Sequence, residues 1–145
     1  MSLTRTVVIF GGARGIGAAV ATRFAAAGDR VFVGDVLEPS PETFADTPRD
    51  LRPTVLHCDV SKPTDIETVF DRALDGGRRL YVVFNNVGIA RYGEVHALSL
   101  EDWKLTLDVN LTAQFLACKR AVTEMRRTGG GVIINTASIL GHASQ

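Results

Sequence analysis

A cluster of glycines lies close to the beginning of the chain, where it separates a short hydrophobic run from an alanine-rich segment. A glycine-rich turn between a strand and a helix lets the backbone approach a pyrophosphate closely, and it directs the free N–H groups of the helix toward the anion. A tight turn without a ligand is the alternative, but this context favours a bound nucleotide. We therefore predict pyrophosphate binding by Gly11, Arg14, Gly15, Ile16 and Gly17.

Asp35 ends a second hydrophobic run, eighteen residues after Gly17. A carboxylate at this place accepts hydrogen bonds from both hydroxyls of an adenosine ribose and repels the 2′-phosphate of NADP. Arg14 favours the opposite choice, because a guanidinium beside the ribose can pair with that phosphate. The carboxylate weighs more, so the sequence predicts NAD as the cofactor, with NADP less favoured. A solvated turn aspartate is the simpler alternative for Asp35.

Short hydrophobic runs alternate with helical patterns along the chain. The runs predict strands at residues 6–10, 30–34, 54–58, 80–84 and 132–135, and the helical patterns cover 18–27, 61–74 and 100–127. Ser61 and Ser99 are the expected N-caps of the second and third helices. Four of the five prolines fall within residues 37–53, which predicts a loop with at most a short helix. This alternation is typical of the α/β class, a doubly wound parallel sheet with helices on both faces.

Length and charge limit the classes of function. The 145 residues, 46% of them hydrophobic, suffice for one domain, and 16 basic side chains balance 16 acidic ones without forming a positive patch. We therefore expect no nucleic-acid partner. The apolar run at residues 7–10 is too short to cross a membrane. Cys58 and Cys118 lack metal-ligand spacing, which predicts two buried thiols, no metal site and a cytoplasmic location.

Further motifs follow the later strands in a fixed order. The glycine spacing is GxxxGxG, and the other motifs are Asp59-Val60, Asn85-Asn86-Val87-Gly88, Asn110 within residues 108–111, and Ser138 at the end of residues 134–138. Together they resemble the short-chain dehydrogenase/reductase family over essentially the whole chain. The resemblance implies a Rossmann-like sheet of order 3-2-1-4-5 in a single domain over residues 1–145. It also implies NAD(P)-dependent hydride transfer between the nicotinamide and an alcohol or carbonyl substrate.

The same resemblance assigns roles to individual residues. Asp59 and Val60 would flank the adenine, and Asn86 and Gly88 would line the cofactor cleft. Asn110 would disturb its helix and hold a water in a proton relay, although an asparagine in mid-helix is usually just exposed. Ser138 would hydrogen-bond the oxygen of the substrate, although a serine after a strand is usually a turn residue.

Three departures from the family pattern stand out. Phe10 replaces the usual Thr before the first glycine, and Val87 replaces the usual Ala. The catalytic Tyr and Lys of the YxxxK motif would fall near position 151, whereas the two tyrosines present, Tyr81 and Tyr92, have no Lys four residues later. We therefore expect the 145 residues to lack the last strands of the sheet and the Tyr–Lys pair. A truncated, catalytically inactive nucleotide-binding or subunit-association protein is the alternative, and a non-dehydrogenase member of the fold, an epimerase or dehydratase that uses bound NAD internally, is another.

Two expectations concern partners. From this part of the chain only Arg91, Tyr92 and His96 could reach a substrate, and they do not define which one. The predicted helix at 100–127 has an apolar surface, which favours a homo-oligomer, a dimer or tetramer, through that helix. Its apolar residues include Trp103, Leu107, Leu111, Phe115, Val122 and Met125.

Overall fold

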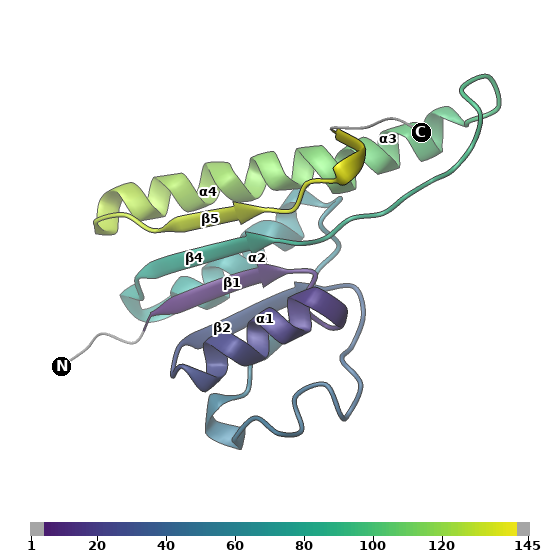
Figure 1. Ribbon diagram of the computed structural model, residues 1–145. Helices are drawn as coiled ribbons and strands as arrows, with labels where there is room; N and C mark the ends of the chain where they lie inside the picture. The colour runs from purple at the N-terminus through teal and green to yellow at the C-terminus, as the bar shows by residue number, and fades with distance from the viewer. Residues whose placement is uncertain (1–4, 142–145) are drawn as a thin grey trace.

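The computed structural model describes residues 5–141 and places five parallel strands in one sheet (Figure 1). The strand order is β3-β2-β1-β4-β5, which confirms the predicted fold class and topology. Neighbouring strands run parallel throughout, as the register pairs Phe10 with Gly34 and with Asn85 show. The strands are β1 Thr6–Phe10, β2 Arg30–Asp35, β3 Thr54–His57, β4 Leu80–Asn85 and β5 Val132–Asn135.

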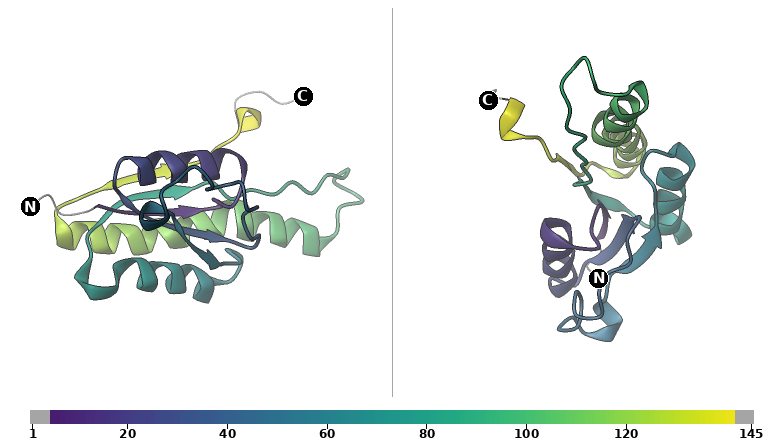
Figure 2. Two further views of the ribbon diagram at one scale, coloured as in Figure 1. Left: turned by 90° about the horizontal axis from the view of Figure 1, so that it is seen from below. Right: turned by 90° about the vertical axis from the view of Figure 1, so that its right-hand side faces the viewer.

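Helices cover both faces of the sheet, with α1 on one side and α2 and α4 on the other (Figure 2). The helices are α1 Gly15–Ala26, α2 Pro63–Leu74, α3 Leu100–Leu107 and α4 Ala113–Thr128. Short 3-10 segments lie at Arg49–Leu51, Asp75–Gly77 and Ile139–Gly141. None of the helices in residues 5–141 is long and apolar enough to cross a membrane.

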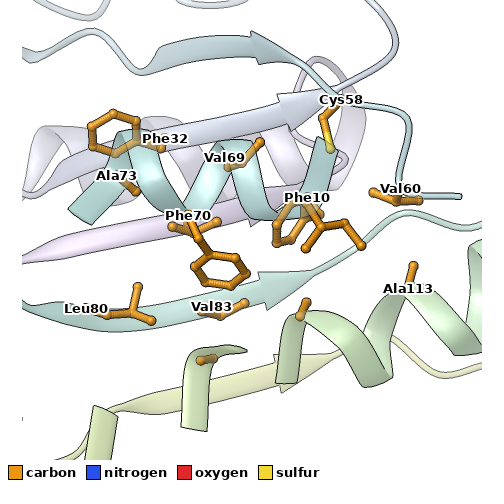
Figure 3. Packing of buried hydrophobic residues seen from close by; sticks show 14 of the residues in the cluster. Phe10, Phe32, Cys58, Val60, Val69, Phe70, Ala73, Leu80, Val83 and Ala113 are labelled. Atoms are coloured by element: carbon orange, nitrogen blue, oxygen red, sulfur yellow. The ribbon is translucent and has the colours of Figure 1, made fainter. Parts of the chain in front are cut away.

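The central strand β1 is buried along its whole length, which explains its unbroken hydrophobic sequence. Alternate side chains point to opposite faces of a sheet. Val8 and Phe10 therefore pack against α2 and α4, while Val7 and Ile9 pack against α1. Figure 3 shows the first of these two clusters, in which the rings of Phe10 and Phe70 lie 5.7 Å apart. This core fixes the carboxyl ends of β1 and β4, where the predicted site residues begin.

Two predicted helix starts differ from the structure. The first helix begins at Gly15 rather than at residue 18, because the end of the glycine loop forms its first turn. The second begins at Pro63 and has no side-chain N-cap, so the prediction that Ser61 caps it is wrong. The Ser61 hydroxyl instead donates to Asp59 Oδ1 at 2.7 Å. The aspartate two residues earlier thus competes successfully for the Ser61 side chain.

The predicted long helix is interrupted in the structure. Ser99 caps α3 as expected, since its Oγ accepts the N–H of Asp102 at 3.0 Å. The segment Asp108–Thr112 is a π-helix, and α4 continues from Ala113 to Thr128. One-turn π segments inside α-helices are frequent at functional sites. Asn110, the residue expected to disturb this helix, lies within the segment.

Candidate functional site

The glycine loop follows β1 at the carboxyl edge of the sheet and is held there by three hydrogen bonds. The N–H of Gly11 donates to the carbonyl of Gly34 at 2.8 Å, and the Asn86 side chain donates to the carbonyl of Gly11 at 2.9 Å. The N–H of Ala13 donates to Asp35 Oδ2 at 2.9 Å. The structure therefore brings together the predicted glycine loop, Asp35 and Asn86, which come from the ends of three neighbouring strands.

Close backbone packing explains why Gly17 carries no side chain. A Cβ at Gly17 would overlap the carbonyl oxygen of Gly11 and lie 2.9 Å from both the Gly11 carbonyl carbon and Gly12 Cα. All three are backbone atoms, so no side chain could move aside. Gly15 differs, because it adopts a φ of +55° and a Cβ there would meet nothing within 4 Å. Close packing therefore excludes a side chain at Gly17, whereas at Gly15 there is space for one and the positive φ favours glycine.

The first turn of α1 presents backbone donors that the protein leaves unused. Among residues 5–141, no acceptor receives the N–H groups of Gly15, Ile16 and Gly17. The helix also has no acidic residue in its first turn and no side-chain cap at Arg14. Unpaired N–H groups and the positive end of the helix dipole form a binding site for an anion. A pyrophosphate fits this cradle, with the Arg14 side chain and the Ile16 side chain, which is 70% exposed, at its rim.

Asp35 shapes the loop that it adjoins. One carboxylate oxygen accepts the N–H of Ala13, and the other accepts the N–H of Leu37 at 3.0 Å. Each carboxylate oxygen has two lone pairs, so the group can still accept hydrogen bonds from a ribose. The solvated-turn interpretation of Asp35 is therefore incomplete, because the carboxylate also ties the glycine loop to the end of β2.

Asp59 and Val60 follow β3 at the same edge of the sheet. Hydrogen bonding from the Ser61 side chain, aided by the Ser61 N–H and by Lys62, lowers the pKa of the Asp59 carboxyl against the opposing effect of burial. Val60 is only 5% exposed and packs in the core cluster with Phe10. A contact between Val60 and an adenine would therefore have to come from the Val60 backbone rather than from its side chain.

Asn110 joins the π-helix to the loop that follows β4. Its Oδ1 accepts the N–H of Ile89 at 2.8 Å, and its Nδ2 donates to the carbonyl of Ile89 at 2.8 Å. The side-chain amide thus pairs with both backbone polar groups of one residue, Ile89. Gly88 lies beside it, since a Cβ at that position would be 3.7 Å from Asn110 Oδ1. Two hydrogen bonds therefore tie the π-helical turn to the loop after β4.

Ser138 and Asn110 line one open hollow of about 590 Å³ together with Gly88. Arg91 and Tyr92 line the same hollow. His96 does not, because it lies on the exposed side of the loop with its Nε2 3.4 Å from Glu94 Oε2. The hollow combines a serine hydroxyl, an amide and the loop after β4, which is an arrangement suited to holding a small polar group.

Several polar contacts in this region were not expected from the sequence. Thr136 donates its N–H to Asn85 at 3.0 Å and accepts a hydrogen bond from Gln114 at its carbonyl at 3.1 Å. The buried Asn85 side chain donates to Asn135 at 2.7 Å across neighbouring strands. The one available signal was that both strands end in asparagine, which places the two residues opposite each other in a parallel pair.

The two cysteines lie in different environments. Cys58 is buried, and burial together with the carboxylates of Asp65, Asp59 and Asp35 raises its pKa to about 12. Cys118 is only partly buried and contacts Asn135, so the prediction of two buried thiols is wrong for this residue. Within residues 5–141 no three His, Cys, Asp or Glu side chains gather in a way that could hold a metal ion.

A stripe of apolar side chains on α3, the π-helix and α4 is exposed. Trp103, Leu107, Leu111 and Phe115 follow one another at intervals of four residues and are between 37% and 64% exposed. Met125, which the sequence grouped with them, is buried in the core instead. The stripe therefore ends before the last turn of α4.

Comparisons with known proteins show the family to which the chain belongs. Residues 5–145 match the family model for the short chain dehydrogenase. The 3-alpha-(or 20-beta)-hydroxysteroid dehydrogenase of Mycobacterium tuberculosis is 36% identical over 139 residues, which are 96% of this chain and 53% of that protein. The cis-4-hydroxycyclohexanecarboxylate dehydrogenase of Sinomonas cyclohexanicum is 35% identical over 97% of this chain and 57% of its own length.

A solved structure is similar as well. The crystal structure of levodione reductase has a TM-score of 0.88 and 28% sequence identity, and the match covers 99% of this chain and 58% of that one. The chain spans about half the length of the curated relatives that it matches. The similarity therefore concerns about half of each of these proteins and nearly all of this chain, including its glycine loop, Asn110 and Ser138.

Proposed function

Since the chain belongs to the short-chain dehydrogenase family, we propose that it binds a nicotinamide dinucleotide and supplies part of the active site of an oxidoreductase. The observation that carries this proposal is the row of unused N–H groups at Gly15, Ile16 and Gly17, behind a turn that accepts only glycine at its closest approach. A dinucleotide pyrophosphate would accept these hydrogen bonds and complete the N-terminal cap of α1.

We further propose NAD rather than NADP as the cofactor. Asp35 stands at the end of β2, where a ribose bound next to the glycine loop would meet its carboxylate. The N–H groups of Ala13 and Leu37 fix that carboxylate in place, so it cannot swing away from a 2′-phosphate. Repulsion between the two anions supports NAD. Arg14 offers one opposing cation, and it sits on the exposed rim of the loop.

The chemistry follows from the hollow that Ser138 and Asn110 share. The nicotinamide, when bound, exchanges a hydride with the carbon that carries the reacting hydroxyl or carbonyl oxygen. Ser138 would hydrogen-bond that oxygen and hold the carbon at a fixed distance from the cofactor. Asn110 would keep the Ile89 peptide and the π-helix in register along the wall of the hollow, and that wall would orient the substrate.

The proton that accompanies the hydride needs a further group. The residues four positions after Tyr81 and Tyr92 are Asn85 and His96, so the 145 residues contain no YxxxK pair. The cofactor cradle at the start of α1 would equally serve a second candidate function, a protein that binds the dinucleotide or another subunit without turnover. The two candidates share the cofactor site and differ only in whether the alcohol or carbonyl compound reacts.

The relatives suggest the substrate class. Two of them are named for a 3-alpha-(or 20-beta)-hydroxysteroid and for cis-4-hydroxycyclohexanecarboxylate, and the 3-alpha-hydroxyl and the 4-hydroxyl of these names are each on a carbon ring. We propose a ring-borne secondary alcohol, or the corresponding ketone, as the substrate. We also propose a cytoplasmic homo-oligomer in which the stripe of Trp103, Leu107, Leu111 and Phe115 forms the contact between copies. A buried stripe would remove this apolar surface from water.

The test uses the protein that carries these 145 residues, at its natural length. NADH binding is measured by calorimetry, and turnover is followed by the absorbance of reduced nicotinamide with a panel of cyclic ketones. We expect Ser138→Ala to lower kcat by about a hundredfold or more while leaving NADH affinity unchanged, with Ser40→Ala as a control outside the hollow. Binding without turnover would establish the second candidate, and absence of NADH binding would refute both.

A further inference from the structure

Arg91 is the one charged residue among the described residues that line the hollow of Ser138 and Asn110. We propose that Arg91 selects substrates that carry a carboxylate in addition to the reacting hydroxyl or carbonyl group. The inference rests on the proposed function, because it concerns the ligand of the same hollow. It adds a charge requirement that the glycine loop, Asn110 and Ser138 do not impose.

The guanidinium of Arg91 is anchored on one side only. Its Nε lies 3.5 Å from Asp102 Oδ1, and within residues 5–141 neither of its terminal nitrogens donates a hydrogen bond. Asp102 is itself held by the Ser99 hydroxyl, which donates to its other oxygen at 2.8 Å. Ser99, Asp102 and Arg91 therefore form a short chain that positions the cation. The two terminal nitrogens form the edge of a guanidinium that pairs with both oxygens of a carboxylate.

The pair with Asp102 orients Arg91 but contributes too little stability for the fold to require an arginine there. Both side chains are about half exposed, at 52% and 43%, and the contact is long for an ion pair. Exposed pairs of this kind contribute little to stability. Asp102 also does not line the hollow, so its carboxylate would not meet the ligand. The remaining wall is uncharged, which leaves the Arg91 charge unopposed on the side of the hollow.

The rest of the wall explains why the anion would go to Arg91 and not elsewhere. The Asn110 amide gives one of its two N–H groups to the Ile89 carbonyl and its oxygen to the Ile89 N–H, so it can offer an anion at most one neutral N–H and no charge. The other wall residues near Arg91 are apolar or aromatic, among them Val87, Ile89, Ala90 and Tyr92. A ring compound would therefore place its apolar body against this wall and its carboxylate on Arg91.

The experiment compares two ring compounds of nearly equal shape, one with a charged carboxylate and the other with a neutral carboxamide in its place. On the natural-length protein saturated with NADH, calorimetry gives the affinities for 4-oxocyclohexanecarboxylate and for its neutral carboxamide. We expect the carboxylate to bind about fivefold more tightly, as for an ion pair with a half-exposed arginine. The preference should disappear in Arg91→Gln, persist in Arg91→Lys, and persist in Arg49→Gln, a control at an exposed arginine outside the hollow.

The outcomes separate this proposal from the proposed function. Equal affinities for the two compounds in the native protein would overturn the role of Arg91 while leaving NADH binding intact. A preference that survives in Arg91→Gln would overturn it too, as would NADH binding without binding of either ring compound. Failure of NADH itself to bind would refute the proposed function, and the inference would fall with it.

Discussion

Replacing Gly17 by alanine tests whether the glycine loop is shaped by backbone packing to hold a pyrophosphate. The added Cβ would collide with the carbonyl oxygen of Gly11 and lie 2.9 Å from two further backbone atoms of the loop. Ordinary contacts of a Cβ begin near 3.4 Å. The two 2.9 Å contacts alone require a shift of about 0.5 Å, the overlap with the Gly11 oxygen requires a larger one, and Gly11, which accepts the Asn86 amide, would shift with the loop.

The magnitude follows from the cost of overpacking. Extra methyl groups in a tightly packed site typically cost about 1–3 kcal/mol. If the loop recovers its native shape only when the dinucleotide is bound, the same free energy is lost from binding. An affinity loss of about 5- to 150-fold for NADH is then expected, because each 1.4 kcal/mol corresponds to about a factor of ten.

The assay measures NADH affinity by calorimetry and the free energy of unfolding by urea titration in Gly17→Ala and in Gly28→Ala. Gly28 has a φ of +84° and a Cβ there would meet nothing within 4 Å, so alanine should cost about 1 kcal/mol of stability through backbone strain alone. NADH affinity should be unchanged in this control. Native affinity in Gly17→Ala would refute the packing argument, and an equal loss in Gly28→Ala would show that the effect is global.

The other predictions concern the wall of the hollow, the buried thiol and the exposed stripe. Asn110→Ala should lower the free energy of unfolding by about 2 kcal/mol in a urea titration, because the backbone N–H and the carbonyl of Ile89 both lose their partner; a change under about 0.5 kcal/mol would contradict this. The pKa of Cys58 is raised from 9.0 to about 12, so between these values the unfolded chain loses a proton that the folded chain keeps. Stability should therefore fall as pH rises above about 9, by up to about 1.4 kcal/mol per pH unit from this group, and Cys58→Ala should show a shallower slope; identical slopes would contradict the assignment. Phe115→Glu should shift the protein toward the monomer in sedimentation experiments, and an unchanged mass would exclude the stripe as the contact between copies.

The sheet was predictable because hydrophobic runs and glycines carry strong local signals. β1 is buried on both faces, and its five residues form an unbroken apolar or β-branched run, which is the pattern typical of a central strand in a parallel sheet. The glycine loop was predictable from its place between this strand and a helix. A turn of this kind needs glycine where the backbone of the first helical turn approaches the backbone of the loop, as Gly17 approaches Gly11. Motif order after the later strands then placed Asp35, Asn86 and Ser138 at one edge.

The details that escaped prediction depend on contacts between distant segments. Ser61 has the sequence context of an N-cap, but its hydroxyl donates to Asp59 Oδ1 instead of capping α2. The exposure of Cys118 and the bond between Gln114 and Thr136 depend on how α4 lies over β5, which no local pattern reports. Likewise, the two-ended bond of Asn110 to Ile89 joins residues twenty-one positions apart.

In the proposed function, the unused N–H groups at the start of α1 bind the pyrophosphate of a dinucleotide. Amide hydrogen exchange on the natural-length protein, with and without saturating NADH, measures those groups directly. Binding should slow exchange at Gly15, Ile16 and Gly17, and NADPH should give weaker protection at the same concentration because of Asp35. NADH binding that leaves the exchange of these three amides unchanged would contradict the claim.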